Sequence, residues 1–309
     1  MERTDIAIVG GGAAGLTAAI YAARERLAAV LIDDYPGGQI LQAALVDNYP
    51  GLPEISGEEL GEAFRQHAQD KGAVFLESTV AHIKRENDIF VLTLDDGVQT
   101  SELRARSVIY AAGCRHRLLG VEGEARLTGH GVSYCASCDA AFYPQKTVAV
   151  VGGGNTALGD ALLLSRIAET VYLIHRRDTF RASAALVEAV KQTDNIQLIL
   201  HTVPLEICGE KAVTGIRLRN QNDQTQQLLQ IDGVFAAVGM QPDTAMVSDF
   251  VRCDETGYVI AGEDGITSCP GLFAAGDIRT KQLRQVITAA ADGANCVRSA
   301  EHYLRTRKG

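Results

Sequence analysis

The chain has 309 residues, of which 46% are hydrophobic, a size that allows one large domain or two of ordinary size. Its formal net charge of -9 argues against a general nucleic-acid-binding protein, because affinity for phosphates comes from concentrated lysine and arginine. No stretch approaches the roughly 18 apolar residues that span a bilayer, and no secretory signal precedes the first apolar run, so we expect a cytoplasmic protein without a membrane partner.

The first motif is a glycine-rich turn between a predicted strand and a predicted helix. Residues 6–9 form an apolar, β-branched run, residues 10–15 fit G-x-G-x-x-G, and residues 16–24 favour a helix. A second apolar strand, 29–32, ends at Asp33. Such glycines let the backbone approach a pyrophosphate at a helix N-terminus, and the acid accepts hydrogen bonds from a ribose. The pattern predicts a dinucleotide site; the alternative is a tight strand-helix turn that binds no ligand.

The next segments complete a first unit. Residues 57–71 have the pattern of an amphipathic helix, with Ser56 as its N-cap. Residues 89–94 and the run after a turn at 95–97 resemble a hairpin, and residues 107–112 are predicted to form another apolar strand.

Two cysteines separated by two residues, Cys135 and Cys138, lie between two glycine-rich loops. Such a pair can close a small disulfide, and one of the two thiols usually has a lowered pKa that makes it a nucleophile. Asp139 follows directly and can exchange a proton. A structural disulfide or half of a zinc site is the alternative. The other cysteines lack motif spacing and are expected to be mostly inert buried thiols in a reducing cytosol: Cys114, Cys208, Cys253, Cys269 and Cys296.

A second strand and glycine loop repeat the first. Residues 147–151 are apolar and residues 152–157 fit G-x-G-x-x-A. The residues aligned with Asp33 are basic instead of acidic: His175, Arg176, Arg177 and, shortly beyond, Arg181. Arginines make forked hydrogen bonds to the extra phosphate of NADP, which an acid would repel, so this loop is expected to prefer NADPH over NADH. The alternative is an exposed basic patch on a helix.

The second unit continues on the plan of the first. Residues 213–218 and 228–231 are predicted to form a hairpin, and 234–238 an apolar strand. Residues 271–277 contain a strand that ends in Gly-Asp, and residues 285–304 favour a helix. The chain is therefore predicted to be α/β, with two similar nucleotide-binding units.

In their order, these motifs resemble those of the low-molecular-weight bacterial thioredoxin reductases over nearly the whole chain. Besides the glycine loops, the resemblance rests on Pro36-Gly37-Gly38-Gln39, Asn48-Tyr49-Pro50-Gly51, Cys135-Ala136-Ser137-Cys138-Asp139, residues 175–182, Gly276-Asp277, Arg284-Gln285 and Ala289-Ala290. It implies two Rossmann-like domains. Residues 1–115 and 243–309 would form a FAD-binding domain, and residues 116–242 an inserted NADPH-binding domain that carries the dithiol.

The resemblance also implies which residues act at each site. FAD is expected to be held by Gly10, Gly12, Ala13, Ala14, Asp33, Gly38, Gln39, Asn48, Asp277, Arg284 and Gln285. NADPH is expected to be held by Gly152, Gly154, Asn155, Thr156, His175, Arg176, Arg177 and Arg181. Cys138 would exchange electrons with the flavin, Cys135 would attack the partner's disulfide, and Asp139 would handle the proton. The implied activity is reduction of thioredoxin by NADPH in a homodimer.

Some positions depart from the family's pattern. Gly159-Asp160 stands where a pair of glutamates is usual, and Ala140 where glycine is common, but neither change removes a group that the mechanism needs. Cys114 is also unexpected beside Gly113, and a buried small hydrophobic residue is favoured over a redox-active thiol.

Two other interpretations stay open. A related flavoprotein would reduce another redoxin or a peroxidase, or would oxidise small dithiols with oxygen. A protein of another class would bind nucleotides without catalysis and hold a structural zinc at Cys135, Cys138, Cys114 and one of His116 or His130.

Overall fold

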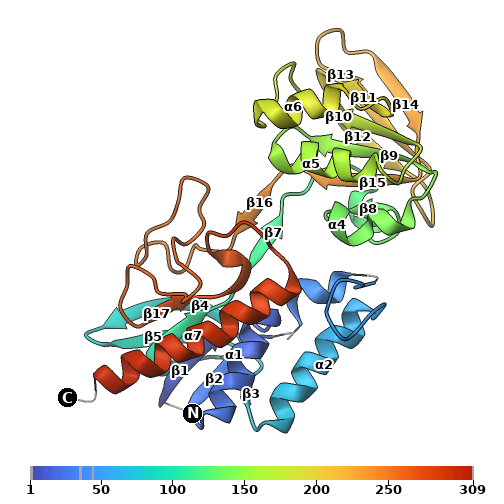
Figure 1. Cartoon of the computed structure of the whole chain (residues 1–309). Helices are drawn as coiled ribbons and strands as arrows, with labels where there is room; N and C mark the ends of the chain where they lie inside the picture. Colours follow the sequence, from blue (N-terminus) through green and yellow to red (C-terminus); the bar gives the residue numbers. More distant parts are fainter. Residues whose placement is uncertain (1–2, 35–36, 44, 308–309) are drawn as a thin grey trace. The chain divides into compact units, whose positions relative to one another are not determined.

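The computed structural model describes residues 3–34, 37–43 and 45–307, and the chain divides into two compact units (Figure 1). We call Met1–Arg115 with Gln241–Gly309 the discontinuous unit, and His116–Met240 the inserted unit. Both contain a parallel sheet with helices, so the predicted α/β class is confirmed.

The discontinuous unit is built on a seven-stranded sheet in the order β3-β2-β1-β6-β5-β4, with β17 also paired to β6. Its strands are β1 (Arg3–Val9), β2 (Ala29–Ile32), β3 (Val74–Leu76), β4 (Thr79–Glu86), β5 (Ile89–Asp95), β6 (Thr100–Tyr110) and β17 (Leu272–Ala274). β1, β2, β3, β6 and β17 are parallel, whereas β5 is antiparallel to β4 and β6. The carboxyl ends of β1, β6 and β17 therefore meet at one edge, where parallel sheets commonly bind nucleotides.

β6 is a single strand of 11 residues, where the sequence had indicated a hairpin arm and a separate strand over 107–112. Its first half is largely exposed and pairs with β5. Its second half is buried and pairs with β1 and β17. The change from a polar to an apolar pattern marks a change of neighbours within one strand, and the prediction of two strands was wrong.

Three helices cover one face of this sheet: α1 (Ala13–Arg24), α2 (Gly57–Asp70) and α7 (Val286–Thr306). α1 and α7 lie side by side (Figure 1). Gly293 of α7 permits this approach, because a Cβ there would lie 2.0 Å from the carbonyl oxygen of Ala14. Among the described helices, none combines the length and the apolar content that a membrane crossing requires.

Ser56 is the N-cap of α2, as the sequence predicted, and Glu59 completes a capping box that was not predicted. The Ser56 hydroxyl accepts a hydrogen bond from the Glu59 N–H at 3.1 Å, and the Glu59 carboxylate accepts one from the Ser56 N–H at 3.1 Å. On the opposite face of the sheet, a second core joins Phe90 and Leu92 of β5 to Val247 and Val259 of the long segment before β17.

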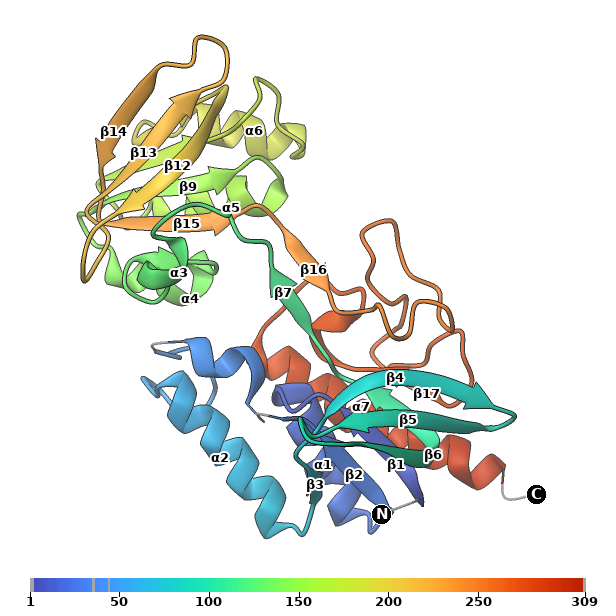
Figure 2. The ribbon, with the colours of Figure 1, turned by 180° about the vertical axis from the view of Figure 1, so that it is seen from behind.

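The inserted unit contains a parallel sheet in the order β11-β10-β9-β15-β8 and a three-stranded antiparallel sheet, β12-β13-β14 (Figure 2). Its strands are β8 (Val132–Ser133), β9 (Thr147–Gly152), β10 (Thr170–Ile174), β11 (Ile196–Ile199), β12 (Thr202–Cys208), β13 (Gly215–Asn220), β14 (Gln226–Gln230) and β15 (Gly233–Ala237). Its helices are α3 (Glu124–Leu127), α4 (Ala136–Asp139), α5 (Asn155–Leu164) and α6 (Ala184–Lys191). The predicted hairpin is confirmed as β13-β14, and β12 adds a third strand that the sequence analysis missed.

Two short strands carry the chain from one unit to the other. β7 (Cys114–His116) leads out of the discontinuous unit, β16 (Met240–Pro242) leads back, and the two pair with each other. Each follows a glycine with a positive φ, Gly113 at 71° and Gly239 at 111°. These glycines allow the backbone to turn where residues with a Cβ would be strained.

Candidate functional site

The first glycine loop leaves open space at the N-terminus of α1. A Cβ on Gly10 would lie 2.5 Å from the Ala111 oxygen, and one on Gly15 would lie 1.8 Å from the Gly10 oxygen. A Cβ on Gly12 would meet no described atom within 4 Å, although Gly12 has an ordinary φ of -74°. Packing within the protein therefore explains two of the glycines, whereas Gly12 keeps room beside a helix N-terminus, where a phosphate is favoured.

Asp33, at the carboxyl end of β2, lies against this loop. Its carboxylate accepts a hydrogen bond from the Gly11 N–H, and the Gly11 oxygen accepts one from the Gly37 N–H at 2.7 Å. The acid thus fixes the glycine loop. The contact of Asp33 with a ribose stays a prediction. Pro36, of the motif Pro36-Gly37-Gly38-Gln39, lies outside the described residues.

Three further predicted residues converge on the same edge of the sheet. Gly38 begins the short helix η1 (Gly38–Gln42), and a Cβ on it would lie 3.0 Å from the Gly12 Cα. The Gln39 side chain donates a hydrogen bond to the Cys114 oxygen. The Asn48 amide donates one to Gln285 Oε1 at 3.0 Å, and Gln285 is the N-cap of α7. The fold therefore unites early and late parts of the chain.

Asp277 follows β17 in the short helix η3 (Gly276–Ile278). Its Oδ1 atom is buried and has no hydrogen-bond partner among the described residues. Burial also raises the pKa of its carboxyl group above the ordinary value. A buried acceptor of this kind fits the hydroxyl group of a bound dinucleotide.

Arg284 and Cys114 have neighbours that the sequence analysis missed. The Arg284 guanidinium lies 4.1 Å from the centre of the Tyr258 ring, a cation-π contact. Burial, and next to it the charge of Asp277, raises the pKa of the Cys114 thiol to about 11. A thiol that stays protonated at neutral pH is a poor nucleophile, which favours the interpretation of Cys114 as a packing residue.

In the inserted unit, Cys135 and Cys138 form a disulfide at the start of α4. The Ser133 hydroxyl accepts a hydrogen bond from the Cys135 N–H at 3.1 Å, and the Cys135 oxygen accepts one from the Cys138 N–H at 3.2 Å. Ala136 anchors the turn in the core. Because the two sulfur atoms are bonded to each other, neither is a thiolate for zinc, and no cluster suited to a metal occurs among the described residues.

Asp139 lies beside the disulfide in a partly buried position. Burial raises the pKa of its carboxyl group, and a hydrogen bond with the Ser133 side chain partly opposes this shift. Tyr143 is also affected, since burial and the nearby Asp139 charge raise the pKa of its phenol to about 12. An aspartate that keeps its proton closer to neutral pH is suited to donate that proton to a thiolate.

The second glycine loop repeats the geometry of the first. A Cβ on Gly152 would lie 2.3 Å from the Ala237 oxygen, and one on Gly153 would lie 2.1 Å from the His175 ring. A Cβ on Gly154, the N-cap of α5, would meet no described atom within 4 Å. Asn155 has a structural contact, because its side-chain oxygen accepts a hydrogen bond from the Ser183 N–H at 2.8 Å.

The basic segment is a loop after β10, not the face of a helix. His175 is buried and pairs through Nε2 with the Thr179 oxygen at 3.1 Å. The Arg181 N–H donates to the Gly153 oxygen at 2.7 Å, which joins this loop to the glycine loop. Arg176, Arg177 and Arg181 are exposed, and no ion pair with an acid is found for them within the described part of the chain. Three exposed guanidinium groups beside a glycine loop can bind an anionic ligand.

The chain matches the family model "Pyridine nucleotide-disulphide oxidoreductase" over residues 4–293. It is 40% identical over 304 residues to a thioredoxin reductase of Treponema pallidum, with 98% of this chain and 97% of the relative covered. It is 37% identical over 306 residues to that of Listeria monocytogenes, covering 98% and 95%. The crystal structure of thioredoxin reductase from Streptococcus pyogenes has a TM-score of 0.91 at 37% identity and covers 98% of this chain and 99% of its own.

Proposed function

Because the chain belongs to the thioredoxin reductases of the pyridine nucleotide-disulphide oxidoreductase family, we propose how its residues divide the work of this enzyme. The activity is reduction of thioredoxin by NADPH through FAD and a redox disulfide. The observation that carries the proposal is the Cys135–Cys138 disulfide with the partly buried Asp139 next to it.

We assign FAD to the discontinuous unit. Gly12 leaves the space for a pyrophosphate, and the buried Oδ1 of Asp277 supplies an acceptor for a hydroxyl group. The other residues proposed to hold it are Gly10, Ala13, Ala14, Asp33, Gly38, Gln39, Asn48, Arg284 and Gln285. When bound, NADPH and FAD would supply the hydride and electron-pair chemistry needed to reduce a disulfide.

We assign NADPH to the inserted unit. Gly154 leaves space for a ligand at the N-terminus of α5. Positive charge for the phosphate that distinguishes NADPH from NADH comes from Arg176, Arg177 and Arg181. Gly152, Asn155, Thr156 and His175 complete the proposed set. Asn155 and His175 act indirectly, because their hydrogen bonds hold in place the loops that carry the exposed arginines.

The reduced dithiol then transfers its electron pair to thioredoxin. The Cys135 thiolate attacks one sulfur of the thioredoxin disulfide, which forms a mixed disulfide and releases the other sulfur as a thiolate. Cys138 attacks Cys135 next, which restores the internal disulfide and releases dithiol thioredoxin. Asp139 gives a proton to a thiolate when the internal disulfide is opened and regains it from solvent.

The partner is tested by steady-state consumption of NADPH with thioredoxin, with another redoxin and with small disulfides. We expect turnover with thioredoxin to exceed the others. The absence of turnover with any thioredoxin would contradict the proposal and favour the related flavoproteins. Five cysteines lie outside disulfides, which fits a reducing compartment, so we propose that the enzyme is cytoplasmic. We also propose that it is a homodimer, and light scattering can measure its mass.

Gly12→Ala is expected to weaken FAD binding at least about tenfold, because the added methyl group occupies space proposed for the pyrophosphate. The free energy of unfolding of the FAD-free protein should change little, since that methyl meets no described atom and φ is ordinary. Flavin fluorescence and urea unfolding measure the two quantities. Gly159→Ala on α5, which also meets no described atom, is the matched control and should leave FAD affinity unchanged. Equal FAD affinity in Gly12→Ala and the native protein would refute the assignment.

Asp139→Asn is expected to lower kcat about 100-fold, because the amide cannot donate the proton to a thiolate. In the native enzyme, the protonated fraction of Asp139 falls as pH rises through its raised pKa, so the rate should decline there, and the variant should lack this dependence. The variant should be at least as stable at neutral pH. A carboxyl whose pKa is raised on folding contributes stability below its unfolded pKa and loses it as pH rises through the folded value. An unchanged pH profile of kcat would exclude this role.

A further inference from the structure

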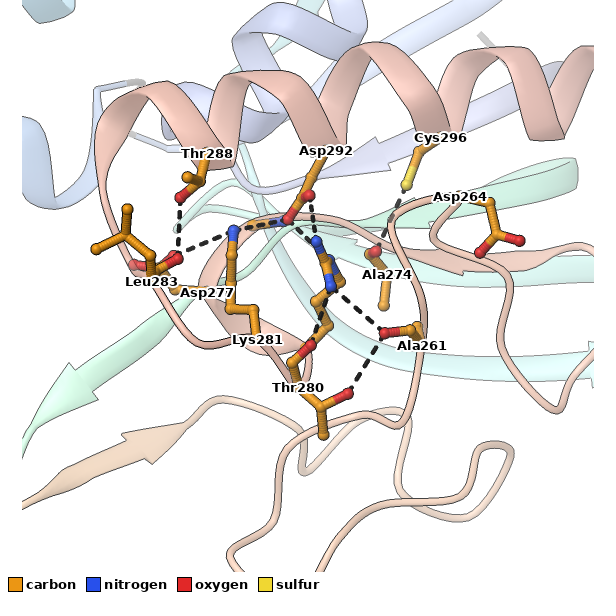
Figure 3. A network of polar contacts seen from close by, with 12 residues as sticks. Ala261, Asp264, Ala274, Asp277, Thr280, Lys281, Leu283, Thr288, Asp292 and Cys296 are labelled. Atoms are coloured by element: carbon orange, nitrogen blue, oxygen red, sulfur yellow. Dashed lines mark hydrogen bonds and ion pairs between the residues drawn. The ribbon is translucent and has the colours of Figure 1, made fainter. Parts of the chain in front are cut away.

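A buried ionic cluster links α7 to the segment that carries Asp277 (Figure 3). Asp292 of α7 is its centre. Its Oδ1 accepts from Nη2 of Arg279 at 2.5 Å, and its Oδ2 accepts from Nε of Arg279 at 2.9 Å and from Nζ of Lys281 at 2.8 Å. The side chains of Arg279, Lys281 and Asp292 are each 7% exposed or less. Such a cluster is costly to bury unless its charges are paired.

The cluster controls the immediate surroundings of Asp277. Asp292 Oδ2 also accepts the Gly276 N–H at 3.0 Å, which fixes the backbone next to Asp277. The Lys281 ammonium lies 3.9 Å from Asp277 Oδ1, close enough for an ion pair but too far for a hydrogen bond. Oδ1 thus has a positive charge nearby, and no hydrogen-bond donor is found for it within the described part of the chain.

Among Arg279, Lys281, Asp292 and Asp277, the charges balance only when Asp277 is ionised. Arg279 and Lys281 contribute two positive charges, and Asp292 neutralises one of them. Asp277 supplies the second negative charge. Both oxygens of Asp292 are already used by Arg279, Lys281 and Gly276, whereas Oδ1 of Asp277 still accepts no hydrogen bond from the described residues.

We propose that Lys281, anchored by Asp292, is a positioning residue for FAD: it keeps Asp277 as a carboxylate whose Oδ1 accepts a hydroxyl group of the bound dinucleotide. Lys281 itself donates to Asp292 and acts on the cofactor through Asp277. The inference rests on the proposed assignment of FAD to the discontinuous unit. It adds a residue that the sequence motifs did not single out.

The groups around Asp277 give the direction of the effect. Burial raises the pKa of Asp277, and the cations that oppose this are led by Lys281. The charged and titratable groups that face Asp277 are Lys281, Arg284, Asp292, Arg279, Cys114 and Tyr258. Replacing Lys281 with a neutral residue should raise the pKa of Asp277 further, so the carboxylate is lost as the pH falls.

The test is Lys281→Gln, which removes the charge and keeps a donor for Asp292. FAD-free protein is titrated with FAD, and binding is followed by flavin fluorescence at about pH 8.5 and about pH 5.5. We expect affinity within about threefold of the native protein at the higher pH and at least about tenfold weaker at the lower pH. Lys281→Arg keeps the charge and should stay within about threefold at both values.

Asp277→Asn identifies the route of the effect. In this background position 277 cannot titrate, so adding Lys281→Gln should change FAD affinity by less than about threefold at either pH. A loss of equal size at both pH values, or a full loss that persists with Asp277→Asn, would overturn the proposal. If the Lys281→Gln protein does not fold without FAD, the Lys281→Arg protein provides the test. A tenfold loss of FAD affinity in Lys281→Arg would overturn the proposal, and FAD affinity like that of the native protein would support it. Absence of FAD binding by the native protein would instead refute the assignment of the cofactor.

Discussion

Replacing Cys138 with serine is expected to lower kcat for thioredoxin reduction at least about 1000-fold, the largest effect that we predict for a single residue. The structure joins Cys138 to Cys135, and serine cannot form that disulfide. The variant should still accept electrons from NADPH in an anaerobic titration followed by flavin absorbance, because the proposed cofactor residues are unchanged. Steady-state assay and titration together locate the block after reduction of the flavin.

The matched control is Cys208→Ser in the same unit. Cys208 is half-buried and forms no disulfide, so kcat should stay within about twofold of the native value. A Cys138→Ser enzyme that reduces thioredoxin at the native rate would show that the electrons take another route. Loss of NADPH-dependent flavin reduction in that variant would contradict the order of transfer that we propose.

The double substitution Arg176→Ala and Arg177→Ala is expected to raise KM for NADPH about 100-fold while KM for NADH changes less than about twofold. Both side chains are exposed, and no acidic partner is found for them in the described residues, so they are available for the phosphate that NADH lacks. Each charge-assisted hydrogen bond contributes about 1.5–3 kcal/mol, which is roughly 10- to 100-fold in affinity. Initial rates at varied concentrations of the two coenzymes provide the measurement.

Arg166→Ala is the control for this pair. Arg166 is exposed in the same unit, after α5 and away from the basic loop in sequence, and its removal should leave both KM values unchanged. Equal losses with NADPH and NADH in the double variant would mean that the arginines act on the loop's structure and not on the phosphate. A preference for NADH in the native enzyme would refute the assignment directly.

The elements that could be predicted were those with a strong local pattern. The strand-glycine-helix units that begin at β1 and β9, the capped helix α2 and the hairpin β13-β14 all follow from apolar periodicity and turn residues. β4 was missed because only Ile83 of its eight residues is fully buried, so an edge strand of this kind has little apolar signal. The boundary of β6 was missed because its neighbours change along its length.

The proposed catalytic residues were visible in the sequence because they are adjacent in it. Cys135, Cys138 and Asp139 lie within one turn, whereas the buried Lys281 and Asp292 meet only after the fold forms. The contact of Arg284 with Tyr258 is likewise set by tertiary packing. Motif spacing can therefore indicate which groups serve the chemistry, but not the side chains that hold them in the required charge state.

The divided chain of the discontinuous unit affects the order in which the protein can be completed during synthesis. The whole sequence of the inserted unit, His116–Met240, precedes the last segment of the discontinuous unit, Gln241–Gly309. The inserted unit can therefore fold before that segment emerges from the ribosome. At that stage β6 still lacks β17, and α1 lacks α7, the helix that lies beside it. Of the two glycine loops, the one that is translated first therefore belongs to the unit that is completed last. The apolar face of α1 needs protection until α7 has been synthesised.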